Sequence, residues 1–224
     1  MKRKRSDEKS TTKRTPAGAA VMQPRVTEAL TRALFVEWAR HGYGMLSMEA
    51  VAKRAGVGKA ALYRRWPSKF AMVTERLETV GFAITQVADT GSLRGDILAN
   101  LRSLRSALRR RIVRQIVADL HAEMARNSPL AERVRNRLQI ERRLRGRSIY
   151  QRAIARGELS PDIDFELLND LGAAELYWRQ VVTGAKADDR YLNTLTDLIL
   201  AATGVPAEHR PVEGNGSGCL SDEG

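Results

Sequence analysis

One stretch of the chain restricts the possible folds more than any other: residues 48–69, MEAVAKRAGVGKAALYRRWPSK. Its apolar residues recur at helical spacing on both sides of a glycine, which predicts two short helices, Met48 to Ala55 and about Lys59 to Arg65. Ser47 can cap the first helix, and Gly56 follows it at a position that favours a positive φ angle. Two helices joined by a tight glycine turn are typical of a helix-turn-helix, whose second helix enters the DNA major groove.

The same pattern also fits an ordinary corner of two helices with a solvated basic face. Three features favour DNA binding over that interpretation. Small residues lie where the helices should cross, the turn has a fixed length, and Lys59, Tyr63, Arg64 and Arg65 are left on the outer face.

Residues 55–69, AGVGKAALYRRWPSK, resemble the DNA-binding signature of the tetracycline-repressor (TetR) family of bacterial regulators, approximately A-G-V-S-K-G-T-L-Y-x-x-F-x-S-K. The chain departs from it at Gly58, Ala60 and Ala61, and Trp66 replaces the usual Phe. The resemblance implies an all-α protein of about nine helices, with an N-terminal three-helix DNA-binding domain and a larger helical ligand-binding and dimerisation domain. It also implies a homodimeric, sequence-specific transcription regulator, such as a repressor that a small-molecule ligand releases from a palindromic operator.

We predict four segments along the chain. Residues 1–24 form a disordered basic arm, which either adds DNA contacts or only solubilises the chain, and 25–70 form the helix-turn-helix domain. Residues 71–204 form the helical regulatory and dimerisation domain, and 205–224 a disordered tail. The expected helices outside the motif are 25–41, 68–87, 93–108, 112–125, 128–156, 165–183 and 188–203, and Ser128 is the expected cap of the fifth of these.

The last two expected helices are apolar on more than one face. Such a helix covers two surfaces, here the domain's own core and a second copy of the chain. The alternative is that both helices are buried centrally in one domain. Residues 156–184 also resemble the C-terminal domain of a TetR subgroup that dimerises through its last two helices, which implies a dimer interface on these helices. Its predicted residues are Leu171, Leu176, Leu195, Leu198 and Ile199.

The net charge of +12 is distributed unevenly along the sequence. Residues 1–75 contain 16 Lys and Arg against 6 Asp and Glu, and residues 76–156 contain 18 against 7, whereas residues 157–224 contain 4 against 13. A basic front and an acidic rear favour a protein that presents one end to a polyanion. A basic protein that binds nucleic acid without sequence specificity is the alternative.

The sequence contains no pattern typical of an enzyme or a cofactor site. His41, His121 and His209 are scattered, the single Cys219 lies in a Gly/Ser stretch, and neither H-E-x-x-H nor a phosphate-binding loop is present. Asp119 and Glu123, with His121 between them, could in principle touch a metal, but acidic pairs on helices are more often solvated or paired with arginine. We therefore expect no enzyme activity, no metal and no cofactor. Without a membrane-spanning run or a secretory signal, we expect a cytoplasmic protein.

The expected DNA contacts divide into base readers and phosphate binders. Arg64 is the candidate for bidentate reading of guanine, and Ala60 and Ala61 for apolar contact with base edges. The resemblance implies a phosphate contact at position 61 that alanine cannot make. The candidates for phosphate or sugar contacts are Ser47, Lys59, Tyr63, Arg65 and Lys69.

The expected effector pocket follows from the resemblance, because no residue pattern indicates it. Met124, Tyr177 and Trp178 are candidates to line it, although each fits a core position equally well. The arginines of residues 133–156 indicate either an anionic ligand or a solvated surface.

Overall fold

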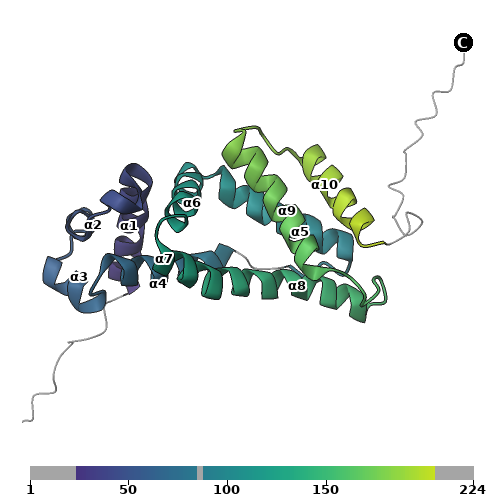
Figure 1. The fold of residues 1–224 in the computed structure, drawn as a ribbon, viewed down its shortest axis with the longest axis horizontal. Helices are drawn as coiled ribbons and strands as arrows, with labels where there is room; N and C mark the ends of the chain where they lie inside the picture. The colour runs from purple at the N-terminus through teal and green to yellow at the C-terminus, as the bar shows by residue number, and fades with distance from the viewer. Residues whose placement is uncertain (1–23, 85–87, 205–224) are drawn as a thin grey trace, which may run out of the picture.

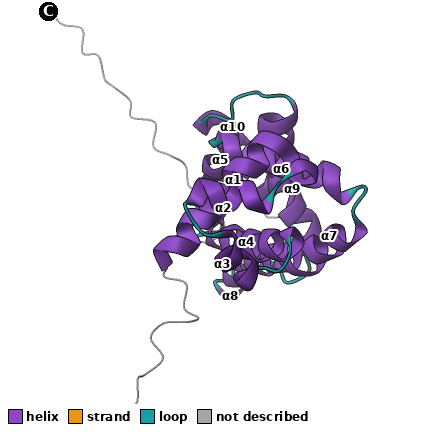
Figure 2. Cartoon of the chain, turned by 90° about the vertical axis from the view of Figure 1, so that its left-hand side faces the viewer, coloured by secondary structure: helices purple, strands orange, loops and turns teal. Residues whose placement is uncertain are grey.

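A computed structural model describes residues 24–84 and 88–204, and within these ranges every regular element is helical (Figure 2). The predicted arm, the tail and the end of the predicted 68–87 helix therefore lie wholly or partly outside the described residues. The described elements form nine continuous helical runs, the number that the resemblance implied; a π-helical turn interrupts one of these runs and another ends a second run. They are α1 (Pro24–Met45), α2 (Met48–Ala55), α3 (Lys59–Arg65), α4 (Lys69–Ile84), α5 (Leu93–Arg109), α6 (Arg111–Met124), α7 (Ser128–Arg133), η1 (Val134–Gln139), α8 (Ile140–Ala155), α9 (Phe165–Tyr177), η2 (Trp178–Val182) and α10 (Asp189–Ala202).

The helix-turn-helix has the predicted bounds. The Ser47 hydroxyl accepts a hydrogen bond from the Ala50 N–H at 3.3 Å and caps α2. Gly56 ends α2 with a φ of 67°, a left-handed conformation that a glycine adopts without steric cost. Leu62 and Trp66 point inward, with exposed fractions of 0% and 1%. This burial leaves the opposite side of α3 free for another molecule.

The first helix is regular up to the predicted end at His41, and a second helical stretch follows it. Gly42 has a φ of 73°, so the helix kinks there and resumes for one turn to Met45. The kink brings the buried Tyr43 ring edge-on to Trp38, with 5.9 Å between the ring centroids. Gly42 therefore breaks the regular helix at the predicted position, and the label α1 covers the helical stretches on both sides of it.

The first hydrophobic core lies beneath the helix-turn-helix but extends beyond the predicted 25–70 unit. Besides residues of α1 to α4, it contains buried side chains of α6, α7 and η1: Ile116, Leu120, Leu130 and Val134. The second core joins α5, α8, α9 and α10 at the other end of the molecule (Figure 1). The run from α7 through η1 to α8 extends along one side and connects the two ends.

The predicted 128–156 helix differs from the observed one at its start and in its middle. Asn127, not Ser128, is the cap: its side chain accepts from the Leu130 N–H at 3.2 Å, because the chain turns into the helix one residue early. Val134–Gln139 forms a π-helical turn, and a second one, Trp178–Val182, ends the predicted 165–183 helix. Short π-helical insertions occur frequently at functional sites.

Three of the five predicted dimer residues lie in the chain's own core. Leu176, Leu195 and Ile199 are at most 4% exposed and belong to the second core, so for them the alternative of central burial describes the structure. Leu171 is half-buried, and Leu198 is 62% exposed. Both helices are apolar on more than one face, and the face that covers the chain's own core contains these three residues.

Candidate DNA-binding interface and effector cavity

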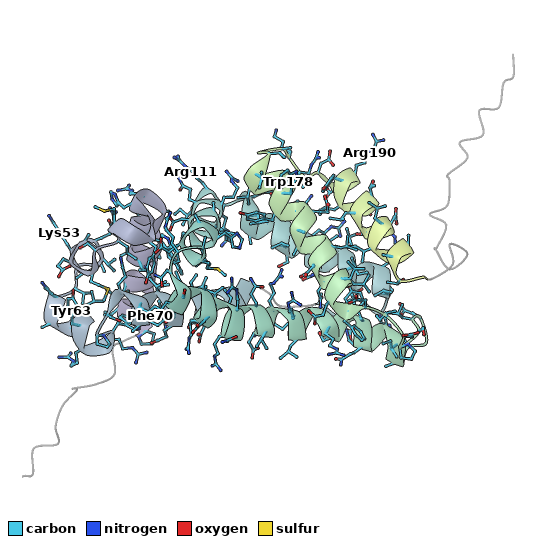
Figure 3. All side chains as sticks on the ribbon, viewed as in Figure 1. Lys53, Tyr63, Phe70, Arg111, Trp178 and Arg190 are labelled. Atoms are coloured by element: carbon cyan, nitrogen blue, oxygen red, sulfur yellow. The ribbon has the colours of Figure 1, made fainter. Side chains whose placement is uncertain are left out.

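The outer side of α3 lies at one end of the molecule, opposite α10, where Figure 3 shows Tyr63 pointing outward. Lys59, Ala60, Arg64 and Arg65 are exposed, whereas Ala61 is half-buried. Among the described residues, none forms a hydrogen bond or ion pair with Arg64. The helix therefore presents one unpaired guanidinium beside a small apolar side chain.

Glu49 of α2 organises the polar groups next to that guanidinium. Its carboxylate accepts hydrogen bonds from Lys59 Nζ at 2.7 Å, from the Tyr63 hydroxyl at 3.0 Å and from the Ser47 hydroxyl at 3.2 Å. The hydrogen bond from Lys59, followed by those from the backbone and Tyr63, lowers the pKa of Glu49 to about 2. The same pairing raises the pKa of Lys59. Three predicted DNA contacts are thus held together by one carboxylate that sequence reasoning missed.

Arg65 and Lys69, both predicted to bind phosphate, also have partners within the chain. Arg65 pairs with Glu75 at 3.0 Å, and Glu75 also accepts from the Trp66 indole N–H at 2.8 Å. Lys69 Nζ donates to the carbonyls of Tyr43 at 2.7 Å and Gly44 at 3.0 Å. Lys69 thereby supplies a donor to carbonyls in the last turn of α1, where the end of a helix leaves carbonyls without their usual partners.

Asp119 of α6 fastens the kinked end of α1. One carboxylate oxygen accepts from the Trp38 indole N–H at 2.6 Å and from the Tyr43 backbone N–H at 2.8 Å. A Cβ at Gly42 would lie 2.9 Å from the other oxygen, so the glycine allows this close approach as well as the positive φ. Through these hydrogen bonds Asp119 acts as a structural acceptor. The described residues contain no group of three or more potential metal ligands.

A cavity of about 430 Å³ lies between α5, α6, η1, α8 and α9. Its apolar wall includes Leu108, Val117, Leu120, Val134 and Leu138, and its polar wall consists of His121, Gln139, Arg142, Asp170 and Tyr177. The His121 ring meets the Tyr177 ring edge-on, with 5.0 Å between centroids. Partial desolvation, and then the charge of Arg142, lower the pKa of His121 and favour its neutral form. The size is typical of small-molecule sites, which are roughly 300–1,000 Å³.

Comparison with known proteins agrees with this geometry. Residues 30–75 match the family model described as bacterial regulatory proteins of the tetR family, and residues 87–199 match the tetracyclin repressor-like C-terminal domain. An uncharacterized HTH-type transcriptional regulator of Mycobacterium tuberculosis is 32% identical over 193 residues, which cover 83% of this chain and 90% of that protein. The chain belongs to the TetR family. It is a DNA-binding transcription regulator of the helix-turn-helix type.

Other relatives of this TetR-family chain include the DNA-binding transcriptional repressor TetR of Mycobacteroides abscessus, 30% identical over 162 residues, with 72% of this chain and 84% of that protein covered. The solved structure of the TetR family transcription regulator SCO0332 superposes with a TM-score of 0.63 at 26% identity, covering 80% of this chain and 98% of the other. Bacillus subtilis FadR in complex with stearoyl-CoA has the same TM-score at 15% identity, covers 78% of this chain and 98% of its own, and shows the shared fold.

One of the three predicted ligand residues lines the cavity of this TetR-family chain. Tyr177 lines it. Met124 packs against the first core, and Trp178 is 60% exposed at the start of η2, where Figure 3 shows it pointing outward. Neither residue lines the cavity. For Trp178 the reason is that the helical turn that directs Tyr177 inward directs the next residue away. Within the described ranges, no helix has both the length and the apolar character required to span a bilayer.

Proposed function

We propose that this chain is a cytoplasmic homodimeric repressor that binds a palindromic operator through 25–70 and releases it when a small molecule fills the cavity. The observation that carries the proposal is the outer side of α3, where an unpaired Arg64 and the exposed Ala60 stand beside the Glu49 cluster. An arginine reads guanine through two parallel hydrogen bonds, and an alanine can contact a thymine methyl.

The phosphate contacts come from groups that are already positioned. Lys59, Tyr63 and Ser47 converge on Glu49 and would exchange part of that pairing for phosphate oxygens on docking. Phosphate contacts fix the orientation of the helix, whereas base contacts supply sequence preference. Arg65 and Lys69 support the fold of the motif through Glu75 and the α1 carbonyls.

An exposed apolar surface supports the dimer. Leu167, Trp178 and Val182 on the α9–η2 run and Leu198 on α10 are 50% to 62% exposed. They belong to two neighbouring helices of the second core, as do the half-buried Leu171 and Tyr191. Two copies of such a helix pair would form a four-helix interface about a two-fold axis, and the dimer would match a palindromic operator.

Shared side chains support the ligand response. Leu120 and Val134 line the cavity and are also buried members of the core beneath the helix-turn-helix. Leu138 of η1 lines the cavity and lies against α4, where a Cβ at Gly81 would be 2.6 Å from Leu138 Cδ1. A ligand that displaces this wall would shift packing under the DNA-binding helices, which is coupling between two sites.

Operator binding tests the proposal. The protein is titrated with DNA from its own upstream region over a salt series, with excess competitor DNA. We expect one palindromic site to survive competition. Arg64→Ala should weaken binding by about 1–3 kcal/mol and relax the preference at one base position in each half-site.

Arg111→Ala is the matched control, because Arg111 is exposed at the start of α6, away from α3, as Figure 3 shows. It removes the same charge and should leave operator preference unchanged. Equal losses for both variants, with all binding titrated away by competitor and salt, would indicate a non-specific nucleic-acid-binding protein instead.

A further inference from the structure

Arg142 differs from Arg143, Arg152 and Arg156 in how its charge is balanced. Arg143 pairs with both Glu166 and Asp170, and Arg152 and Arg156 share Asp96 and Asp89. Arg147 lies over the Phe165 ring. By contrast, Arg142 Nε donates to the amide oxygen of Gln139 at 3.1 Å, and its nearest carboxylate oxygen, from Asp170, is 3.8 Å away.

The position of Arg142 puts this poorly balanced charge in the wall of the cavity. The Arg142 side chain is one-third exposed, and it also borders a smaller cavity of about 70 Å³ between α5, α8, α9 and α10. Desolvation lowers the pKa of Arg142, the Asp170 carboxylate opposes this effect, and the charge of Arg143 adds to it. A guanidinium remains charged even so, and a site that desolvates it favours an incoming anion.

The other residues that line the cavity favour a ligand with an apolar body. Eight of its thirteen lining residues are apolar, and they come from α5, α6, η1 and α9. Besides Arg142, the charged residue that lines the cavity is Asp170. Asp170 also pairs with Arg143, and Arg143 has Glu166 as a second partner. His121, favoured in its neutral form, adds an aromatic wall with Tyr177.

We infer that the cavity binds an apolar organic carboxylate, with the carboxylate on the Arg142 guanidinium and the apolar body against Leu108, Val117 and Leu138. Two guanidinium N–H groups can hold a carboxylate in the bidentate geometry that makes such pairs strong. The inference rests on the proposed ligand response, because it names the chemical class of the effector for that same site.

Three matched fluorescent probes test the charge preference without DNA: pyrenebutyrate, pyrenebutanol and pyrenebutylamine, titrated into the full-length protein. We expect the acid to bind at least about tenfold more tightly than the alcohol. This factor is at the low end of the contribution of a charge-assisted hydrogen bond, because solvent reaches Arg142. The amine should bind most weakly. Equal binding of acid and alcohol, tighter binding of the amine, or no binding of the acid would overturn the inference.

Two variants locate the preference. Arg142→Met keeps the length of the side chain and removes its charge, so it should abolish the advantage of the acid while leaving binding of the alcohol unchanged. Arg137→Met is the control, because Arg137 is exposed on η1 and lies outside the cavity lining. An acid preference that survives Arg142→Met, or that Arg137→Met removes equally, would show that the anion binds elsewhere.

Operator binding in the presence of each probe separates this inference from the proposed function. If the acid binds through Arg142 but the operator complex persists, the site assignment holds and the ligand-released repressor fails. If the protein binds a specific operator but shows no acid preference, the repressor holds and the carboxylate assignment fails.

Discussion

The DNA-binding end and the effector end of this molecule are built in opposite ways. In α2 and α3 the helices are regular, and the exposed polar groups of Lys59, Tyr63 and Ser47 are held by Glu49. Around the cavity, a π-helical turn interrupts the run from α7 to α8, and the carboxylate oxygen nearest to Arg142 is 3.8 Å away. A surface that must match a fixed DNA groove gains from preorganisation, whereas a cavity that must respond to a ligand needs walls that can move.

The two ends are nevertheless not independent in their packing. Four side chains of α6, α7 and η1 complete the core beneath the helix-turn-helix, and Asp119 of α6 holds the kink of α1. The DNA-binding end and the effector end therefore differ in their surfaces but share part of their interior. Variants that separate the two ends, or that alter one surface alone, measure how far the contrast holds.

The largest effect should come from cutting the chain between the two ends. A fragment of residues 24–75 lacks Ile116, Leu120, Leu130 and Val134, all at most 6% exposed in the intact chain. If each buried aliphatic side chain contributes as much as a large-to-small core substitution removes, losing four of them costs on the order of 10 kcal/mol. This is comparable with the whole stability of a domain. We expect the fragment to show little helical circular dichroism and no cooperative melting. A fragment that melts cooperatively near the transition of the intact chain would show that the DNA-binding unit folds alone.

The second largest effect should come from a buried carboxylate at the effector end. Asp96 is 0% exposed and accepts from the Thr90 N–H at 2.6 Å, the Thr90 hydroxyl at 2.8 Å and Arg152 at 3.1 Å. Asp96→Ala should lower the free energy of unfolding by about 3 kcal/mol, because it removes the buried acceptor of the Thr90 N–H and hydroxyl and the closer carboxylate partner of Arg152, which keeps only Asp89. Asp197→Ala, at a partly exposed pair with Arg94, should cost less than about 1 kcal/mol. Urea unfolding of both variants checks the difference, which equal losses would contradict.

The contribution of Asp96 also depends on pH. Burial alone would raise its pKa, but the hydrogen bonds from Thr90 and the charge of Arg152 outweigh burial, so its pKa in the folded chain is lowered. The folded-state pKa lies below the unfolded-state value of about 3.9. The stabilisation by Asp96 is therefore complete above about pH 3.9 and is lost as the pH falls through the folded-state pKa. The stability difference between wild type and Asp96→Ala should therefore shrink as the pH falls below about 4.

Sequence reasoning predicted the DNA-binding end better than the effector end. The bounds of α2 and α3 follow from local signals, namely a serine cap, a glycine with positive φ and a 3.6-residue apolar period. Partners from distant segments have no such signal. Nothing local indicated that Glu49 would hold Lys59, that Asp119 would reach α1 across 81 residues, or that Leu176 and Ile199 would face the core. The π-helical turns were missed for the same reason, because a steady apolar period predicts an uninterrupted α-helix.

A smaller effect should come from the contact that joins the two ends. Asp119→Ala removes the acceptor of both the Trp38 indole and the Tyr43 N–H, and Trp38 is 0% exposed, so its donor is left without a partner. We expect a loss of about 2 kcal/mol in the free energy of unfolding and a changed near-ultraviolet tryptophan signal. Glu123→Ala, one helical turn along α6, removes a carboxylate that pairs with Arg126 and should change that signal little. An unchanged stability in Asp119→Ala would mean that the two ends are held together by apolar packing alone.

The smallest effect should come from the carboxylate that organises the DNA-binding surface. Glu49→Gln removes a negative charge next to the DNA while keeping a group that can still accept from Lys59 and Tyr63. Operator affinity at low salt should therefore rise, by less than about tenfold, and the gain should fade as salt screens the charge. Glu132→Gln, an exposed acid on α7, is the control and should leave affinity unchanged.

The pH dependence of this last variant separates charge removal from loss of preorganisation. Because the pKa of Glu49 is about 2, its carboxylate is ionised throughout the range in which the protein would be assayed, so the gain in affinity should be the same at pH 6 and pH 8. Fluorescence anisotropy of a labelled operator measures it. A loss of affinity in Glu49→Gln would mean that the ionised carboxylate is needed to position Lys59 and Tyr63. Preorganisation would then outweigh repulsion even at the surface where the DNA binds.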